Sequence, residues 1–273
     1  MMKKIWPLLI IFLITFLAAC SSDKETDSKD QGGEKKASAK VQKVVVGTGT
    51  QFPNICFIDK DGNLNGYDIE IVKAIDEKLP EYDFEFKTME FSNLLLSLET
   101  KKIDLIAHQM EVNKERQEKF LFNKEPYNVF PLKVTVHQDN NEIKSIDDLA
   151  GKKVGTSPTS NSTVFLEDYK KKNNLDVELV YGASADFKEQ LKTGRIDAVI
   201  TTPFAVDFSN KQADAQQKVV GDTLLSSKVY FLFNKEEEKL AGRIDEALAE
   251  LKKEGVISEL SKKWLGADYS VDF

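Results

Sequence analysis

Two pairs of similar segments constrain the fold of this 273-residue chain more than any other feature. Residues 98–106, LETKKIDLI, recur as residues 191–199, LKTGRIDAV, a shift of 93 positions. Upstream of these, residues 46–48, VGT, recur as residues 154–156, a shift of 108 positions. The pairs occur in the same order, and each lies on an expected strand that leads into a turn. The repeats therefore predict two lobes built on the same α/β plan.

Hydrophobic periodicity indicates strands and helices in alternation. Residues 43–47 predict a buried strand, residues 69–79 carry apolar side chains at helical spacing, and Pro80 ends that run. The pattern continues with a strand near 84–86, a helix at 94–98, a strand at 103–107 and a helix at 164–172. Such alternation favours an α/β fold with a largely parallel sheet.

Ligands of α/β sheets bind beyond the carboxyl ends of the strands. The segments just past the repeated strands therefore become candidate site segments: 49–52, 108–111, 157–162 and 201–204. If the two lobes face each other with these ends opposed, the segments line one cleft.

Charge and ligand-residue counts exclude several function classes. A formal net charge of −7 argues against nucleic acid as a partner, because affinity for a polyanion depends on Lys and Arg. The two cysteines and two histidines lack the spacing that a four-ligand Cys/His zinc cluster needs, so no metal site and no cofactor are expected. His108 and His137 lack the neighbours of a nucleophilic triad, and Cys56 is expected to be a small core residue.

The first 40 residues predict export and anchoring. Residues 1–19 have the basic start, short apolar stretch and small-residue end of a signal peptide. The alternative, a transmembrane anchor, needs about 20 apolar residues. The sequence LAAC at 17–20 resembles a lipobox, which would place acyl chains such as palmitate on Cys20. Residues 20–40 then form the lipidated cysteine and a polar, disordered tether.

Polar and aromatic residues expected at the cleft are suited to ligand recognition. Arg116 is the only arginine before Gly194, and a guanidinium matches a carboxylate bidentately. Residues 160–163 precede a helix and could bind an anion or simply cap that helix. Phe52 and Phe91 could be cleft walls or core residues.

Short motifs spread over more than 200 residues are Gly62, Gly66-Tyr67-Asp68, Lys102-Ile103-Asp104, Glu115-Arg116, Glu125-Pro126-Tyr127, Asp148-Leu149-Ala150-Gly151-Lys152 and Gly194-Arg195-Ile196-Asp197-Ala198. As a set, these motifs resemble one family. From Lys43 to Leu265 the chain is similar to the extracellular solute-binding proteins of polar amino-acid ABC transporters, solute-binding protein family 3. Residues 200–207, ITTPFAVD, are most similar to the L-cystine-binding lipoproteins of Gram-positive bacteria.

The resemblance implies a two-lobed, periplasmic-binding-protein-like clamshell of type II. Lobe one would be discontinuous, formed by residues 41–134 plus 230–273, and lobe two would be residues 135–229. Residues 132–136 and 229–233 would be the strands that cross between the lobes.

The resemblance also implies roles for individual residues. Arg116 would hold the ligand α-carboxylate, and aromatic walls would enclose the ligand's body. The full set of implied ligand-binding residues is Arg116, Phe52, Phe91, Gln109, Glu111, Ser160, Asn161, Ser162 and Thr202. Many members have an Asp for the ligand ammonium where this chain has Thr202. A hydroxyl supplies no countercharge, so Glu111 is the candidate replacement.

The function implied is that of a lipid-anchored, monomeric binding protein of an ABC importer on the outer face of a bacterial cell membrane. It would capture an amino acid, with L-cystine favoured, and deliver it to a membrane permease. Alternatives are another polar amino acid such as glutamine, a cyclohexadienyl dehydratase-like enzyme with Glu111 as the acid, and a sensing or adhesion role. The enzyme is disfavoured because its substrate has two carboxylates and Arg116 is the only arginine expected in the cleft.

Overall fold

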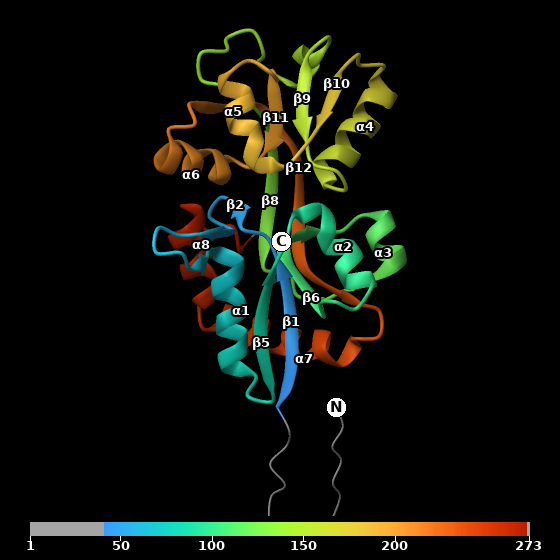
Figure 1. Ribbon diagram of the computed structural model, residues 1–273, viewed down its shortest axis with the longest axis vertical. Helices are drawn as coiled ribbons and strands as arrows, with labels where there is room; N and C mark the ends of the chain where they lie inside the picture. Colours follow the sequence, from blue (N-terminus) through green and yellow to red (C-terminus); the bar gives the residue numbers. More distant parts are fainter. Residues whose placement is uncertain (1–40, 272–273) are drawn as a thin grey trace, which may run out of the picture. The chain divides into compact units, whose positions relative to one another are not determined.

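A computed structural model describes residues 41–271 of the chain, which form one compact unit within residues 39–273 (Figure 1). The expected signal peptide, Cys20 and the tether all lie outside the described residues. In the described range no helix is long and apolar enough to cross a membrane.

A nine-stranded sheet runs through the unit, with the strand order β10-β9-β11-β8-β12-β6-β1-β5 and with β7 paired to β12. Its strands are β1 (Gln42–Thr48), β5 (Tyr82–Thr88), β6 (Leu105–Glu111), β7 (Phe120–Phe122), β8 (Asn128–His137), β9 (Lys153–Thr156), β10 (Glu178–Tyr181), β11 (Ala198–Thr201) and β12 (Gln217–Asn234). A separate three-stranded antiparallel sheet, which the sequence did not predict, contains β2 (Gln51–Phe52), β3 (Cys56–Ile58) and β4 (Leu64–Asn65).

Each end of the large sheet uses the same strand order. On one side β5, β1 and β6 are parallel, and on the other β10, β9 and β11 are parallel. The strands between these groups, β8 and β12, are antiparallel to each other and to their outer neighbours. The expectation of a largely parallel sheet is therefore wrong for its centre. The chain passes from one half to the other along β8 and returns along β12, without the crossover helix that parallel neighbours need.

Helices flank the strands of both halves (Figure 1). They are α1 (Tyr67–Lys78), α2 (Phe91–Glu99), α3 (Lys114–Lys119), α4 (Asn161–Asn173), α5 (Phe187–Lys192), α6 (Pro203–Ala213), α7 (Glu238–Lys253) and α8 (Val256–Leu265), with 3-10 turns at Ile146–Leu149 and Ser184–Asp186. The predicted apolar face of α1 is confirmed, since Ile69, Val72 and Ile75 are all buried. Cys56 is buried in the same core as a free thiol, as expected.

The two repeated segments have the same local structure. Asp104 accepts a hydrogen bond from the Val45 backbone N–H at 2.7 Å, and its own N–H donates to the Val45 carbonyl at 2.8 Å. Asp197 and Lys153 make the same pair of hydrogen bonds at 2.7 and 2.8 Å. Each aspartate thus joins the start of one strand to the first strand of its half, which is a structural role.

Candidate functional site

Strand β6 is irregular at Gln109, and its pairing with β12 shifts register between Met110 and Ile106. Gln109 has a φ of +48°, a left-handed conformation that is unusual for a residue with a side chain. The buried Asp68 carboxylate holds this conformation, accepting from the Gln109 backbone N–H at 2.8 Å and from its side-chain amide at 2.6 Å. The Gln109 amide oxygen accepts from Asn128 at 2.7 Å. Gln109 was predicted to contact the ligand, but its amide nitrogen and its amide oxygen both have hydrogen-bond partners within the protein.

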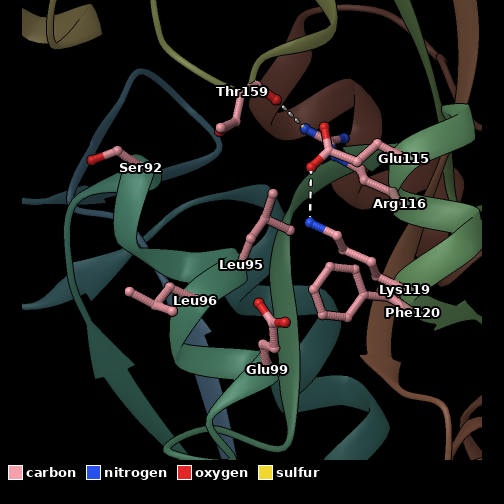
Figure 2. Close-up of a pocket in the computed structure, with 9 residues that line it drawn as sticks. All are labelled: Ser92, Leu95, Leu96, Glu99, Glu115, Arg116, Lys119, Phe120 and Thr159. Atoms are coloured by element: carbon pink, nitrogen blue, oxygen red, sulfur yellow. Dashed lines mark hydrogen bonds and ion pairs between the residues drawn. The ribbon is translucent and has the colours of Figure 1, made fainter.

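Arg116 lies on α3, just after β6, and is only 3% exposed. Asn113 caps α3 by accepting the Arg116 backbone N–H at 2.8 Å. The guanidinium donates to the Glu111 carbonyl at 2.8 Å and to the Thr159 carbonyl at 2.9 Å, the latter bond being drawn in Figure 2. Its buried Nε has no hydrogen-bond partner among the described residues. The predicted carboxylate receptor is thus fixed in place and keeps an unused donor.

Glu111, the last residue of β6, supplies a buried acceptor near this cation. It is 5% exposed, and its Oε1 has no hydrogen-bond partner within residues 41–271. Burial raises the pKa of Glu111 to about 7, while Ser227, Arg116 and Asn161 act in the opposite direction. A carboxyl group in this state ionises readily when a cation is placed beside it.

The start of α4 meets α3 from the other half of the sheet. Ser160 accepts the Thr163 backbone N–H at 3.2 Å and also contacts the Ser162 hydroxyl at 2.9 Å, so this serine does cap the helix. Asn161 accepts from Asn113 at 2.7 Å. Together with the Arg116–Thr159 bond, this contact joins the two halves at the predicted site.

Two half-buried phenylalanines flank His108. The sequence places this residue in a candidate site segment, but its side chain was considered only as part of a catalytic triad. The ring centroids of Phe52 and Phe91 lie 5.4 and 5.1 Å from that of His108. His108 is 8% exposed and its buried Nδ1 has no partner in the described part of the chain. The sequence signal that could have identified His108 as a ligand contact was its position in the candidate segment 108–111.

Thr202 is fully buried and caps α6, accepting the Ala205 backbone N–H at 3.4 Å. Its hydroxyl is therefore engaged in helix capping. Nearby, Asn54 of the β2–β3 loop donates to the carbonyl of Phe204 at 3.2 Å, a second contact between the halves.

A small pocket of about 160 Å³ lies beside Arg116 and Thr159, between α2 and α3. Figure 2 shows Leu95 and Phe120 on its apolar side and the Glu115–Lys119 ion pair at its edge. The described residues contain no group of His, Cys, Asp or Glu side chains that could hold a metal ion. The site offers fixed hydrogen-bonding groups and aromatic surface, which is chemistry for recognition.

The chain is similar to known proteins over most of its length. Residues 44–267 match the bacterial extracellular solute-binding proteins, family 3. The L-cystine-binding protein TcyK of Bacillus subtilis is 52% identical over 98% of this chain and 97% of its own length. The L-cystine-binding protein TcyJ of the same organism is 52% identical over 86% of this chain and 88% of its own length. A Listeria monocytogenes protein, provisionally named an L-cystine ABC transporter, has a similar solved structure, with a TM-score of 0.80, 55% identity and coverage of 85% and 99%.

Proposed function

We propose that this chain, which belongs to family 3 of the bacterial extracellular solute-binding proteins, binds L-cystine and delivers it to the permease of an ABC importer. The chain is a substrate-binding protein and not an enzyme, as are the relatives that it matches over nearly its whole length. The identity of its ligand is the proposal. Two relatives that share about half of its residues carry the name of that ligand.

One observation supports an amino acid as the ligand above all others. The buried Nε of Arg116 and the buried Oε1 of Glu111 have no partner among residues 41–271, although both belong to charged groups. Leaving such groups unpaired is costly, so a bound molecule is expected to satisfy them. An α-amino acid carries a carboxylate for Arg116 and an ammonium for Glu111.

The remaining expected residues complete the proposed site. Phe52 and Phe91 enclose the body of the ligand, and the start of α4 at Ser160, Asn161 and Ser162 adds hydrogen-bond donors from the other half. Gln109 and Thr202 act by holding β6 and α6 in position, since their side chains are already engaged. Glu111 therefore takes the place of the family's aspartate at Thr202.

The two halves are proposed to be lobes that close on the ligand, residues 41–134 plus 230–273 and residues 135–229. The bond from Arg116 to Thr159 and that from Asn113 to Asn161 would then belong to the closed state. A ligand that contacts both lobes favours closure, because it interacts differently with the open and closed forms.

Membrane attachment is the second part of the proposal. Residues 1–19 act as a signal peptide, and Cys20 carries the lipid, palmitate included, that holds a monomeric protein on the outer face of the cell membrane. The polar segment 21–40 then spaces the binding unit from the bilayer. Labelling with a palmitate analogue, lost in Cys20→Ser, tests this attachment.

A ligand screen tests the binding function. The full-length chain in mild detergent is heated with each common amino acid or with L-cystine, without reductant, and positive results are titrated by calorimetry. A ligand at one hundred times its Kd stabilises by about 2.7 kcal/mol, which raises the melting temperature of a protein of this size by about 5 °C. A shift with L-cystine and none with serine or glutamine supports the proposal. A shift with another amino acid alone overturns L-cystine, and no shift at all overturns amino-acid binding.

The affinity for the ligand is expected to fall when the pH drops below about 7. The pKa of Glu111 in the free protein is about 7, and a bound ammonium favours the ionised carboxylate. Protonation therefore competes with binding, and the affinity should decrease up to about tenfold per pH unit between pH 7 and 5.5. Calorimetry across this range measures the slope. Glu111→Gln should bind weakly with a flat profile, and the exposed Glu115→Gln should keep the wild-type slope. A retained slope in Glu111→Gln would refute the assignment.

A further inference from the structure

We propose that His108 recognises the second amino-acid head of the ligand and thereby makes the site selective for a double-headed molecule. This inference rests on the proposed function, since L-cystine consists of two amino-acid heads joined by a disulfide. Arg116 and Glu111 account for one carboxylate and one ammonium, and the second head requires polar partners of its own.

A buried ring nitrogen of His108 without a hydrogen-bond partner supports a role in ligand binding. Buried polar atoms in native proteins nearly always have a hydrogen-bond partner, and an exception needs an explanation. Nδ1 of His108 has none in the described part of the chain. It shares this condition with Arg116 Nε and Glu111 Oε1, which lie within eight positions along β6 and α3.

The His108 ring is confined, so it cannot turn to reach a partner within the protein. The rings of Phe52 and Phe91 pack against it at 5.4 and 5.1 Å between centroids. Gly49 lies so close that a Cβ on it would be 2.8 Å from Nε2 of His108. This close approach requires a glycine, and it fixes the imidazole among the aromatic walls.

The charge state of the His108 ring allows it to accept a hydrogen bond from an ammonium group. Burial lowers the pKa of His108 to about 4, and the Arg116 charge acts in the same direction. The ring is therefore neutral at neutral pH. With its proton on Nε2, its Nδ1 accepts a hydrogen bond, and the second ammonium is a donor.

The separation of the groups fits the length of the ligand. His108 and Glu111 are three positions apart on β6, which corresponds to about 10 Å in an extended strand. The left-handed Gln109 between them shortens that span. The two α-carbons joined by a disulfide lie about 4.4–6.8 Å apart, and each ammonium extends farther by about 1.5 Å. One L-cystine molecule can therefore reach both residues.

The test compares two ligands on the full-length chain in detergent. L-Cystine has two heads, whereas S-methyl-L-cysteine has one head and keeps the sulfur. The wild-type chain should prefer L-cystine. His108→Leu should raise the Kd for L-cystine about 10- to 100-fold, and the Kd for S-methyl-L-cysteine should stay within about twofold because that ligand never reaches position 108. His108→Asn, whose side-chain oxygen can replace Nδ1, should restore most of the L-cystine affinity.

The matched control is His137→Leu, the same change at the other histidine, which lies on β8 and contacts Gln216 and Asp139. It should change neither Kd. If His108→Leu does not fold, as judged by its melting curve, His108→Ala removes the same atom without adding bulk.

The outcomes separate the two proposals. If the wild-type chain does not bind L-cystine, the proposed function fails and the role of His108 fails with it. If the wild-type chain binds L-cystine but His108→Leu weakens both ligands equally or neither, only the role of His108 is overturned. A selective loss that His108→Asn reverses supports the inference.

Discussion

Arg116→Ala is expected to raise the Kd for L-cystine by at least about 100-fold while the protein stays folded. Two charge-assisted hydrogen bonds to a carboxylate contribute about 1.5–3 kcal/mol each, which corresponds to a change in Kd of about 10² to 10⁴. The loss of Arg116 also removes a charge that lowers the pKa of Glu111, so the ammonium receptor becomes harder to ionise. Calorimetry measures the Kd, and a melting curve reports the fold.

The fold should survive because Arg116 is bonded to two backbone carbonyls and is not part of the apolar core. Arg116→Lys should also lose most of the affinity, since an ammonium cannot form the planar, two-bond contact. The control is Arg195→Ala, which removes an exposed arginine of the second repeat. Unchanged affinity in Arg116→Ala would remove this residue from the site.

Gly66→Ala is expected to destabilise the protein by about 3–5 kcal/mol, which combines the cost of a glycine-only conformation with that of a steric clash. Gly66 precedes α1 with a φ of 126° and a ψ of 177°. A Cβ at this position would lie 2.4 Å from the carbonyl oxygen of Ile55, and that backbone cannot easily move. The melting temperature should fall by about 10 °C. Because Asp68 follows two residues later and holds Gln109, the affinity for the ligand should fall as well.

The matched control is Gly242→Ala, in the middle of α7. Apart from the helix's own backbone and the adjacent residues, no atom lies within 4 Å of the Cβ position there, and alanine favours a helix over glycine by about 1 kcal/mol. This variant should be as stable as the wild type or slightly more stable. Equal melting temperatures for the two variants would show that the close approach of Ile55 to Gly66 is not a constraint.

The fold was predictable from the sequence because its signals are local and repeated. The Leu-Lys/Glu-Thr segments and their aspartates reappear as identical hydrogen-bond pairs at Asp104 and Asp197. The antiparallel centre was not predictable from these segments. Apolar strands such as β8 and β12 are similar in composition whichever direction their neighbours run.

The site was predictable as a set of segments but less so as a set of side chains. Two of these segments do come together, since Arg116 donates to the carbonyls of Glu111 and Thr159 and Asn113 donates to Asn161. Which way a side chain turns depends on backbone conformation. The positive φ of Gln109 directs its amide to Asp68, and no sequence pattern encodes that angle. The role proposed for His108 could not be predicted beyond its place in the segment 108–111, because that role depends on the rings of Phe52 and Phe91, which are distant in sequence.

The burial of Cys56 limits thiol–disulfide exchange between this residue and the proposed disulfide ligand. Its sulfur would be 3.5 Å from a Cβ on Gly49, the glycine that packs against His108, so a thiol lies behind the proposed binding site. A thiolate that attacked L-cystine would expel one half of it and trap the other on the protein. Burial raises the pKa of Cys56 to about 12, first by desolvation and then by the nearby Asp68 charge. The thiolate is the reactive form. Relative to an ordinary cysteine with a pKa of about 8.5, the fraction of Cys56 present as thiolate at neutral pH is lower by about three orders of magnitude. The proposed disulfide ligand would therefore be bound beside Cys56 without exchanging sulfur with it.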